Sequence, residues 1–471
     1  MALFDLSEEE RQESLSHAVS LVHDYYTNTS NRNVTPDLDL DHIRQYVKNG
    51  MSKASSSSNK DVIDHVFHGL ESYAVQIAHP SYFGLFNPRP AFPSILSDLF
   101  TATTNPQMAA WSHNPFCFAV EEYIIEELGK RFGFEHPDGT FCSGGAEANQ
   151  TAVLCALNHK FPMYLTQGLQ ALPSRPVLYC SAETHHSIAN AARMCGLGSK
   201  SVRLVPTNDQ LQLKTDDLAR MIDADLQENM TPFMIVATAG TTGPGSIDDL
   251  NSLFQLSEKY HTWFHVDAAF AGALCLTQKH KHILTGIEHA DSITVDIHKW
   301  LSAPMGTGCF VTRHQSILES TFRITAEYMP KDGDPDQAID PYVRSIQWSR
   351  RSLGLRFYMS LLFFGWDGFE QTLNHHMKMG DMLKNKLIEQ DWKIHNHTTL
   401  PIICFSKDNY SDDNITDICA HIVKGKKAWI STYPIHGKQT LRACITNYAT
   451  SEDELNDLVN RLQTAQAKLN L

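Results

Sequence analysis

Paired cysteines are missing from this sequence. Its ten cysteines are scattered singly between Cys117 and Cys444, and no Cys-x-x-Cys pair occurs. Small secreted domains held by disulfides, and most zinc-binding modules, depend on clustered cysteines. We therefore expect free, mostly buried thiols, a reducing cytoplasmic environment and no disulfide framework.

Long apolar runs and an excess of positive charge are also missing. No uninterrupted apolar run approaches the roughly 18 residues that a membrane-spanning helix needs. The 53 acidic residues outnumber the 39 lysines and arginines, and the formal net charge of −14 opposes non-specific binding to nucleic acid or anionic membranes. The acidic first residues differ from a secretory signal. These absences favour a soluble cytoplasmic protein.

The organisation of the chain predicts three parts. With 471 residues, of which 42% are hydrophobic, the chain is long enough for more than one domain. We expect a helical N-terminal extension over residues 1–75, a large α/β domain over 76–350 and a smaller α+β domain over 351–471. In the large domain, apolar segments alternate with helical stretches, which predicts a mainly parallel sheet covered by helices. The expected strands of this sheet are residues 177–180, 233–239, 263–266, 292–295 and 308–312.

The glycine fingerprints of nucleotide-binding proteins are absent, but one glycine turn stands out. Neither a Gly-x-Gly-x-x-Gly motif nor a Walker loop occurs. Gly144 and Gly145 precede a helical stretch at residues 146–159, where backbone N–H groups and the helix dipole would attract an anion. The turn therefore predicts a site for a monophosphate rather than for a nucleotide.

Two charged residues follow neighbouring expected strands. Asp267 ends the strand at 263–266, and Lys299 follows the strand at 292–295. Because one strand and its connection fill the interval, we expect both residues at the same sheet edge. A lysine there can form a Schiff base with an aldehyde, and a carboxylate can pair with a protonated pyridine nitrogen. For each residue alone, the alternative is a surface lysine or a helix-capping aspartate.

Adjacent histidines follow another expected strand. His185 and His186 come after residues 177–180, and an imidazole at a strand end can stack on a flat cofactor. Neighbouring side chains on an extended chain point to opposite faces, so we expect the two rings not to share one ion. The other histidine pairs lack cysteine or carboxylate partners at ligand spacing. We predict no metal site.

Five motifs, taken in order, make the chain resemble the group II pyridoxal-phosphate decarboxylases. They are Ser-Gly-Gly-x-Glu-Ala, Glu-Thr-His-His-Ser, Ala-Gly-Thr-Thr-Gly, His-Val-Asp-Ala-Ala and Asp-x-His-Lys-Trp. That family includes aromatic-L-amino-acid, glutamate, cysteine-sulfinate and diaminobutyrate decarboxylases, and the similarity extends from about His79 to Tyr448. The resemblance implies a fold-type I α/β architecture and pyridoxal 5'-phosphate as cofactor. It also implies a homodimer in which the N-terminal helices wrap the partner subunit.

The resemblance implies roles for individual residues. Lys299 corresponds to the lysine that holds the cofactor, Asp267 to the partner of the pyridine nitrogen and His185 to the histidine that stacks on the ring. Asp296 is a departure, because aromatic decarboxylases tend to have asparagine there, and a carboxylate repels a phosphate dianion unless it caps backbone donors. The positions that correspond to phosphate and ring contacts are Gly144, Gly145, Ala146, Thr242, Ala269, Asp296 and His298.

A tyrosine on a long loop is the implied proton donor. Residues 325–342 are rich in Asp, Pro and Gly and show little periodicity, which predicts a functional loop. Tyr342 best matches the family's catalytic tyrosine, and Tyr328 is the competing assignment. In the family, replacement of this tyrosine accompanies oxidative aldehyde formation, so its presence favours plain decarboxylation.

We predict that the chain decarboxylates an L-amino acid to its amine and CO2. Phe86 and Trp111 suit a flat or apolar side chain and favour an aromatic substrate, whereas Arg89 and His113 would suit an acidic one. Arg442 corresponds to the arginine associated with the substrate carboxylate. Acidic or diamino substrates, transamination and oxidative aldehyde formation stay open. So does a non-catalytic binding or scaffold protein on the same fold.

Overall fold

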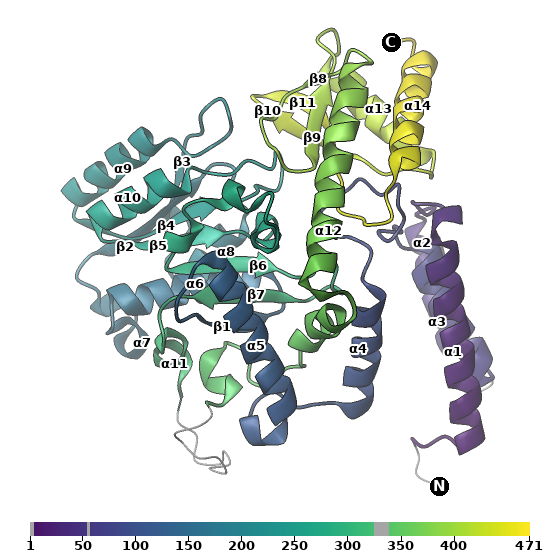
Figure 1. The fold of residues 1–471 in the computed structure, drawn as a ribbon, viewed down its shortest axis with the longest axis horizontal. Coiled ribbons are helices and arrows are strands. Elements are labelled where there is room, and N and C mark those ends of the chain that lie inside the picture. The colour runs from purple at the N-terminus through teal and green to yellow at the C-terminus, as the bar shows by residue number, and fades with distance from the viewer. Residues whose placement is uncertain (1–3, 54–56, 325–338) are drawn as a thin grey trace.

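The apolar segments between residues 138 and 312 form a seven-stranded sheet in the computed structural model, which describes residues 4–53, 57–324 and 339–471 (Figure 1). The strand order is β1-β7-β6-β5-β4-β2-β3; β7 pairs antiparallel with β1 and β6, and the pairs from β6 to β3 are all parallel. The predicted α/β class with a mainly parallel sheet is confirmed. The strands are β1 (Asp138–Cys142), β2 (Arg175–Ser181), β3 (Val202–Val205), β4 (Met230–Thr238), β5 (Trp263–Asp267), β6 (Ser292–Asp296) and β7 (Gly308–Thr312).

Helices cover both faces of this sheet because its strands are apolar on both sides. Val177 and Tyr179 face the layer that contains α5, α9 and α10, whereas Leu178 and Cys180 face α6 and α8. Alternate residues of a strand point to opposite faces, so a strand buried on both sides is a continuous apolar run. The helices of this part are α4 (Phe92–Thr104), α5 (Pro115–Phe132), α6 (Gly145–Lys160), α7 (Tyr164–Gln167), α8 (Ser187–Met194), α9 (Thr215–Gln227), α10 (Leu250–Tyr260) and α11 (Ile317–Phe322).

The carboxyl ends of β4, β5 and β6 meet at one edge of the sheet. Thr238 lies opposite Asp267 in the β4–β5 ladder, and Asp267 lies opposite Thr294 in the β5–β6 ladder. Strand β6 ends at Asp296, three residues before Lys299. The prediction that Asp267 and Lys299 share one sheet edge is therefore confirmed.

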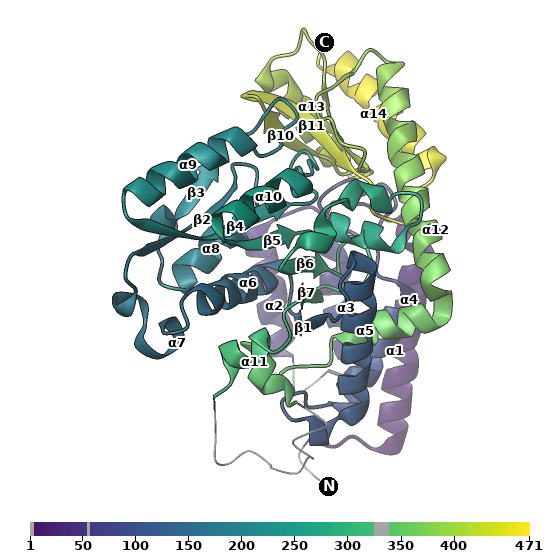
Figure 2. The same ribbon diagram turned by 60° about the vertical axis from the view of Figure 1, so that its left-hand side comes forward.

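The C-terminal part forms a second, antiparallel sheet with the order β10-β11-β9-β8. Its core packs between this sheet, α13, α14 and the end of α12, at one end of the molecule (Figure 2). Helix α12 is interrupted at Gly365, whose φ of 63° is left-handed. The elements are α12 (Gly354–Ile388), β8 (Lys393–Ile394), β9 (Ile402–Ser406), α13 (Asp412–Lys424), β10 (Ser431–Ile435), β11 (Lys438–Cys444) and α14 (Glu452–Lys468).

The N-terminal helices form a group beside α4, on the far side of the molecule from α9 and α10 (Figure 1). They are α1 (Glu8–Asn28), α2 (Leu40–Ser52) and α3 (Asn59–Ser72), and none of the three contains a buried residue. Apolar side chains on them are exposed, among them Leu15, Val47 and Leu70. A helix whose apolar face is exposed lacks the packing that normally stabilises it.

Two expectations about the whole chain can be compared with the structure. All ten cysteines are free thiols, and all except Cys419 are buried, as predicted. No helix within residues 4–53, 57–324 and 339–471 has the length and apolar character needed to cross a membrane.

Candidate active site

A cavity of about 320 Å³ opens at the sheet edge where β4, β5 and β6 end. Its size lies within the range of about 300–1,000 Å³ that is typical of small-molecule sites. The walls come from the glycine turn before α6, the segment between β2 and α8, and the residues that follow β5 and β6. Every residue predicted to contact the cofactor lines this one cavity: Gly144, Gly145, Ala146, His185, Thr242, Asp267, Ala269, Asp296, His298 and Lys299.

Asp267 is held at the end of β5 with both carboxylate oxygens occupied. Its side chain is buried, Oδ2 accepts a 2.8 Å hydrogen bond from Asn149 Nδ2, and Oδ1 accepts one of 3.1 Å from the backbone N–H of Ala269. These two donors fix the Asp267 carboxylate as a hydrogen-bond acceptor at the edge of the cavity.

His185 lies in the turn between β2 and α8. Its Nδ1 is 2.9 Å from Ser187 Oγ, and burial lowers the pKa of the imidazole, with the nearby Asp267 opposing that effect. The His185 ring lies only 4.0 Å from the His186 ring, centroid to centroid. The prediction that the two rings point to opposite faces is wrong, because this segment turns into α8 instead of continuing as a strand. Within the part of the chain that the structure describes, no cluster of three or more His, Cys, Asp or Glu side chains could hold a metal ion.

Lys299 occupies the tight turn after β6. Its Nζ lies 3.1 Å from Asp296 Oδ2 and 5.6 Å from the centre of the Phe86 ring. The next residue, Trp300, is buried; its indole donates a 2.9 Å hydrogen bond to His376 Nδ1, and its ring stacks on Phe270. This anchored neighbour fixes the position from which the lysine side chain extends into the cavity.

The glycine turn before α6 forms another wall of the cavity. Gly144 has a φ of 154°, and helix α6 begins directly after it without a side-chain cap. A Cβ atom added to Gly145 would lie 2.9 Å from Asp296 Oδ2. The turn therefore needs glycine, and it leaves the first backbone N–H groups of α6 available to an anion.

Asp296 places a carboxylate under this turn. It is almost fully buried, and its Oδ1 has no hydrogen-bond partner among the described residues. Its Oδ2 lies 3.8 Å from His298 Nε2, in addition to the ion pair with Lys299. An unpaired buried carboxylate oxygen is costly, so this atom marks an incompletely satisfied part of the site.

Phe86 is the one predicted substrate residue that lines the cavity. It stacks on Phe270 with ring centroids 4.0 Å apart. Arg442 lies behind Phe86, with its guanidinium carbon 5.3 Å from the centre of the Phe86 ring. The three guanidinium nitrogens of Arg442 donate to the backbone carbonyls of Thr242, Gly243 and Gly84.

The other predicted substrate and loop residues gather elsewhere. Trp111 donates its backbone N–H to the carboxylate of Asp340 at 2.8 Å, and the backbone N–H of Tyr342 donates to the Ala109 carbonyl at 3.1 Å. The Tyr342 ring packs against Trp348 with centroids 4.4 Å apart. Of the described residues, those lining the cavity do not include Trp111, His113, Arg442 or Tyr342. Tyr328 and residues 325–338 lie outside the described part of the chain.

Among the polar residues of the cavity that the sequence did not predict, Asn149 and Ser187 hold the predicted ones in place. Asn149, on the first turns of α6, bonds Asp267, and Ser187, at the start of α8, bonds His185. Asn149 lies four residues after Gly145, one helical turn further on. That spacing places its side chain on the same side of α6 as the turn, and it is the signal that could have identified it.

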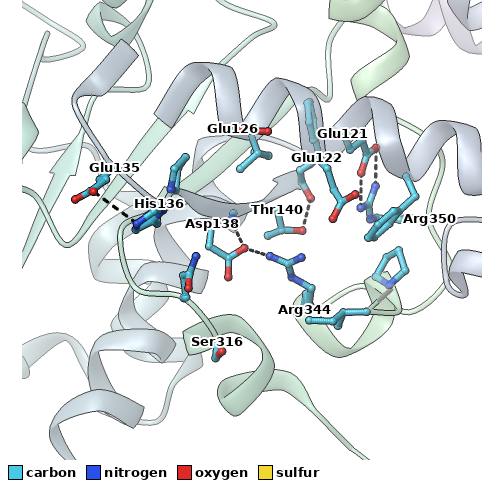
Figure 3. Close-up of a pocket in the computed structure, with 18 residues that line it drawn as sticks. Glu121, Glu122, Glu126, Glu135, His136, Asp138, Thr140, Ser316, Arg344 and Arg350 are labelled. Atoms are coloured by element: carbon cyan, nitrogen blue, oxygen red, sulfur yellow. Dashed lines mark hydrogen bonds and ion pairs between the residues drawn. The ribbon is translucent and has the colours of Figure 1, made fainter. Parts of the chain in front are cut away.

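A second and larger cavity, of about 570 Å³, lies beside α5 and β1 (Figure 3). It is rich in carboxylates, but Arg350 pairs with Glu121, and Arg344 pairs with Asp138. Burial raises the pKa of Glu122, which also lines it. Lys299 and the glycine turn do not belong to this cavity. The predicted cofactor-binding residues therefore line the smaller cavity and not the larger one.

Comparison with known proteins places this geometry in context. The family model described as "Pyridoxal-dependent decarboxylase conserved domain" matches residues 45–408. An aromatic-L-amino-acid decarboxylase of Bacillus atrophaeus is 27% identical over 478 residues, covering 99% of this chain and 97% of the relative. A glutamate decarboxylase of Drosophila melanogaster is 30% identical over 325 residues, covering 69% of this chain and 64% of the relative.

Solved structures with low sequence identity share the fold. The crystal structure of mouse CSAD superposes with a TM-score of 0.92 at 23% identity, covering 98% of this chain and 99% of that one. The crystal structure of Oryza sativa TDC with PLP and tryptamine gives a TM-score of 0.90 at 19% identity, covering 99% and 100%. These likenesses extend over the N-terminal helices and both sheets.

Proposed function

The chain belongs to the family of pyridoxal-dependent decarboxylases, and on that premise we propose that its substrate is an aromatic L-amino acid, released as the corresponding amine and CO2. Membership of the family makes the protein a pyridoxal-phosphate-dependent amino-acid carboxy-lyase. The residues that line the cavity beside Lys299 support the aromatic substrate.

The cavity meets the chemical needs of the cofactor. When bound, pyridoxal phosphate supplies a cationic ring that accepts the electron pair left by the departing carboxylate. Lys299 would hold the cofactor covalently, Asp267 would pair with its ring nitrogen, and His185 would stack on the ring. The N–H groups that follow Gly144 would bind the phosphate at the start of α6.

Protein groups carry out the remaining steps. The apolar rings of Phe86 and Phe270 exclude water from the region next to the lysine. A loop tyrosine, Tyr342 with Tyr328 as the competing assignment, protonates the substrate Cα. Lys299 would supply the amine that releases the product. The apolar surroundings favour loss of neutral CO2, because a carboxylate is poorly solvated there.

The aromatic assignment rests on one observation, the lack of a spare arginine among the described residues that line the cavity. Arg89, which the sequence offered for an acidic substrate, donates to the Tyr26 carbonyl, and its guanidinium lies 3.8 Å from the centre of the Tyr26 ring. Arg442 is occupied by backbone carbonyls. Among the described lining residues, the cationic or basic side chains are Lys299, His185 and His298. An acidic side chain would therefore enter without a dedicated cation, whereas a flat ring would contact Phe86.

An acidic amino acid is the second candidate. It is favoured by the similarity to the Drosophila glutamate decarboxylase and to acidic amino acid decarboxylases of Mus musculus and Xenopus tropicalis at 28% and 30% identity. Those matches cover 63–64% of each relative, whereas the match to the aromatic enzyme covers 97%. Because it spans nearly the whole of both chains, we rank the aromatic substrate first.

A homodimer is the proposed assembly. The exposed apolar side chains of α1, α2 and α3, which have no buried residue, would be covered by a second copy of the chain. Sedimentation of the full chain tests this proposal. A dimer at micromolar concentration is expected, and a fully active monomer would contradict it.

An amine-release screen tests the substrate assignment. The purified protein loaded with pyridoxal phosphate is incubated with each common L-amino acid, and CO2 and amine are both measured. Equimolar CO2 and amine from an aromatic amino acid is the expected result. Release from glutamate, aspartate or a diamino acid alone would refute the aromatic assignment. Ammonia or a keto acid in place of the amine would refute decarboxylation.

A further inference from the structure

We propose that Asn149 is a positioning residue whose side-chain amide sets the direction of a buried hydrogen-bond chain. This chain runs from β5 and β6 to the cavity. It holds Asp267 as an acceptor and His185 as a neutral imidazole that carries its hydrogen on Nε2. The donors and acceptors at the two ends of this chain determine the histidine tautomers and the direction in which each hydrogen bond is donated.

The inner end of the chain is fixed by an indole. Trp263 Nε1 can only donate, and it lies 2.8 Å from Ser292 Oγ, so this hydroxyl accepts there. The Ser292 hydroxyl hydrogen is then available to His265 Nδ1 at 2.8 Å. Burial lowers the pKa of His265 to about 4, so the ring carries one hydrogen near neutral pH. That hydrogen is on Nε2, which lies 3.1 Å from Asn149 Oδ1 and donates to it.

The amide of Asn149 is fixed from both sides. Its Oδ1 accepts from His265 and from Thr294 Oγ1 at 2.8 Å. Its Nδ2 has two hydrogens and two acceptors, Asp267 Oδ2 and Ser187 Oγ, each at 2.8 Å. A flipped amide would place its oxygen against the Asp267 carboxylate and its two hydrogens against the Nε2–H of His265. Asn149, Asp267, Ser187, His265 and Thr294 are all buried, so a mismatched arrangement would be costly.

The outer end of the chain reaches His185. Because Ser187 Oγ accepts from Asn149, its own hydrogen points to His185 Nδ1 at 2.9 Å. The backbone N–H of Ser187 also approaches this nitrogen, at 3.3 Å. Nδ1 therefore acts as an acceptor, and the ring hydrogen lies on Nε2.

The charges around His185 agree with a neutral ring. Burial is the main cause that lowers its pKa, and His186 and Lys299 act in the same direction. Asp267 and Asp296 oppose them. These four groups and the two donors of Ser187 are the neighbours that set the protonation of the ring.

This arrangement has a consequence for the reaction. Asp267 and His185 are the two side chains assigned to the cofactor ring, and a single amide connects them. With its hydrogen on Nε2, His185 offers a donor to the cavity and not a lone pair at that atom. His185 therefore acts as a hydrogen-bond donor to the cavity in its resting state.

NMR of cofactor-free protein tests the tautomer. The protein is labelled with ¹⁵N-histidine, and the His185→Gln variant identifies the signal of His185. At pH 7.5 we expect the signature of a neutral ring with hydrogen on Nε2. In Ser187→Ala, which removes the hydroxyl donor but keeps the backbone N–H, we expect the fraction of rings with hydrogen on Nδ1 to increase. An imidazolium, or an Nδ1–H ring in the unaltered protein, would overturn the proposal.

Cofactor affinity tests the role of the amide. Asn149→Asp replaces the donor to Asp267 with an acceptor, so the dissociation constant for pyridoxal phosphate should rise about tenfold or more. Asn149→Ala, which leaves only the Ala269 N–H on Asp267, should act in the same direction. Ser187→Ala should weaken binding less than either variant, because it leaves the bond between Asn149 and Asp267 intact.

A matched control lies on the same helix. Asn158 donates to the hydroxyls of Ser320 and Thr321, and it does not line the cavity. Asn158→Asp makes the same chemical change in α6 and should leave cofactor affinity unaltered. If Asn149→Asp folds and binds the cofactor as tightly as the Asn158→Asp protein does, Asn149 does not position Asp267.

Discussion

The amine of Lys299 lies 3.1 Å from the carboxylate of Asp296, and the same carboxylate lies directly beside the glycine turn at Gly145. One carboxylate therefore contacts the position of the covalent bond and the position of the phosphate. Its second oxygen has no hydrogen-bond partner among the described residues. Asp296 is the point at which this chain departs most clearly from the pattern of aromatic decarboxylases.

Replacement of Asp296 by asparagine should strengthen cofactor binding. The Asp296→Asn variant removes a negative charge next to the phosphate and supplies an amide donor. We expect the dissociation constant for pyridoxal phosphate to fall by roughly tenfold, which corresponds to about 1.4 kcal/mol. Equilibrium titration with the cofactor measures this change. Asp408→Asn, which removes the carboxylate of an exposed pair with Lys393, is the control, and weaker binding by Asp296→Asn would contradict the expectation.

Arg442 should contribute chiefly to stability. A lysine at this position could not donate to all three backbone carbonyls that Arg442 contacts. Arg442→Lys should therefore lower the free energy of unfolding by about 2–4 kcal/mol. Urea denaturation measures the loss, and Arg461→Lys, on an exposed helix face, should change little. A stable Arg442→Lys protein with a raised KM would instead support the predicted contact with the substrate carboxylate.

Buried histidines should make the folded state sensitive to acid. Burial lowers the pKa of His265 to about 4 and that of His376 to about 3, whereas an unfolded histidine titrates near 6.5. Between these values the unfolded chain binds more protons than the folded one, so stability falls as the pH falls below about 6.5. From pH 7.5 to 5.5, each of the two residues should account for a loss of about 1.4 kcal/mol.

Urea denaturation of the cofactor-free protein at several pH values measures this dependence. His376→Asn should reduce the loss between pH 7.5 and 5.5 by about 1.4 kcal/mol, because asparagine can still accept from Trp300 but does not titrate. The exposed His436→Asn variant should leave the pH dependence unchanged. A pH dependence that is the same in His376→Asn as in the unaltered protein would show that His376 does not stay neutral when buried.

The loop tyrosine should control protonation of the product. Tyr342→Phe keeps the ring that packs against Trp348 but removes the hydroxyl. We expect amine release to fall by about 100-fold or more, in line with the loss of a general acid, with cofactor binding retained. Tyr328→Phe tests the competing assignment of the proton donor. If it alone loses activity, the proton donor is Tyr328.

The sheet and the cofactor cavity could be predicted because their signals are local. Strands β5 and β6 are apolar runs that end in Asp267 and Asp296, and parallel pairing brings those ends together. Strand β1 was not predicted because it is short and contains a glycine, Gly139. A Cβ atom at this position would lie 2.4 Å from the Phe310 carbonyl oxygen, so the strand needs glycine there. Only the tertiary structure reveals that close approach.

The errors at the site have similar causes. The sequence does not show that the chain turns at His185 and His186, so the rings were expected on opposite faces. Asn149 carries no motif of its own, and its role depends on residues from β5, β6 and α8 that meet only in the fold. The backbone carbonyls that occupy Arg442 come from two distant segments, which no sequence spacing could indicate.

The most direct test of the account is to locate the covalent bond to the cofactor. The protein loaded with pyridoxal phosphate is reduced with borohydride and digested, and the modified peptide is sequenced by mass spectrometry. We expect the pyridoxyl group on Lys299, and no stable visible absorption from a Lys299→Ala protein. A pyridoxyl group on another lysine, with an unmodified Lys299, would contradict the assignment of this cavity as the active site.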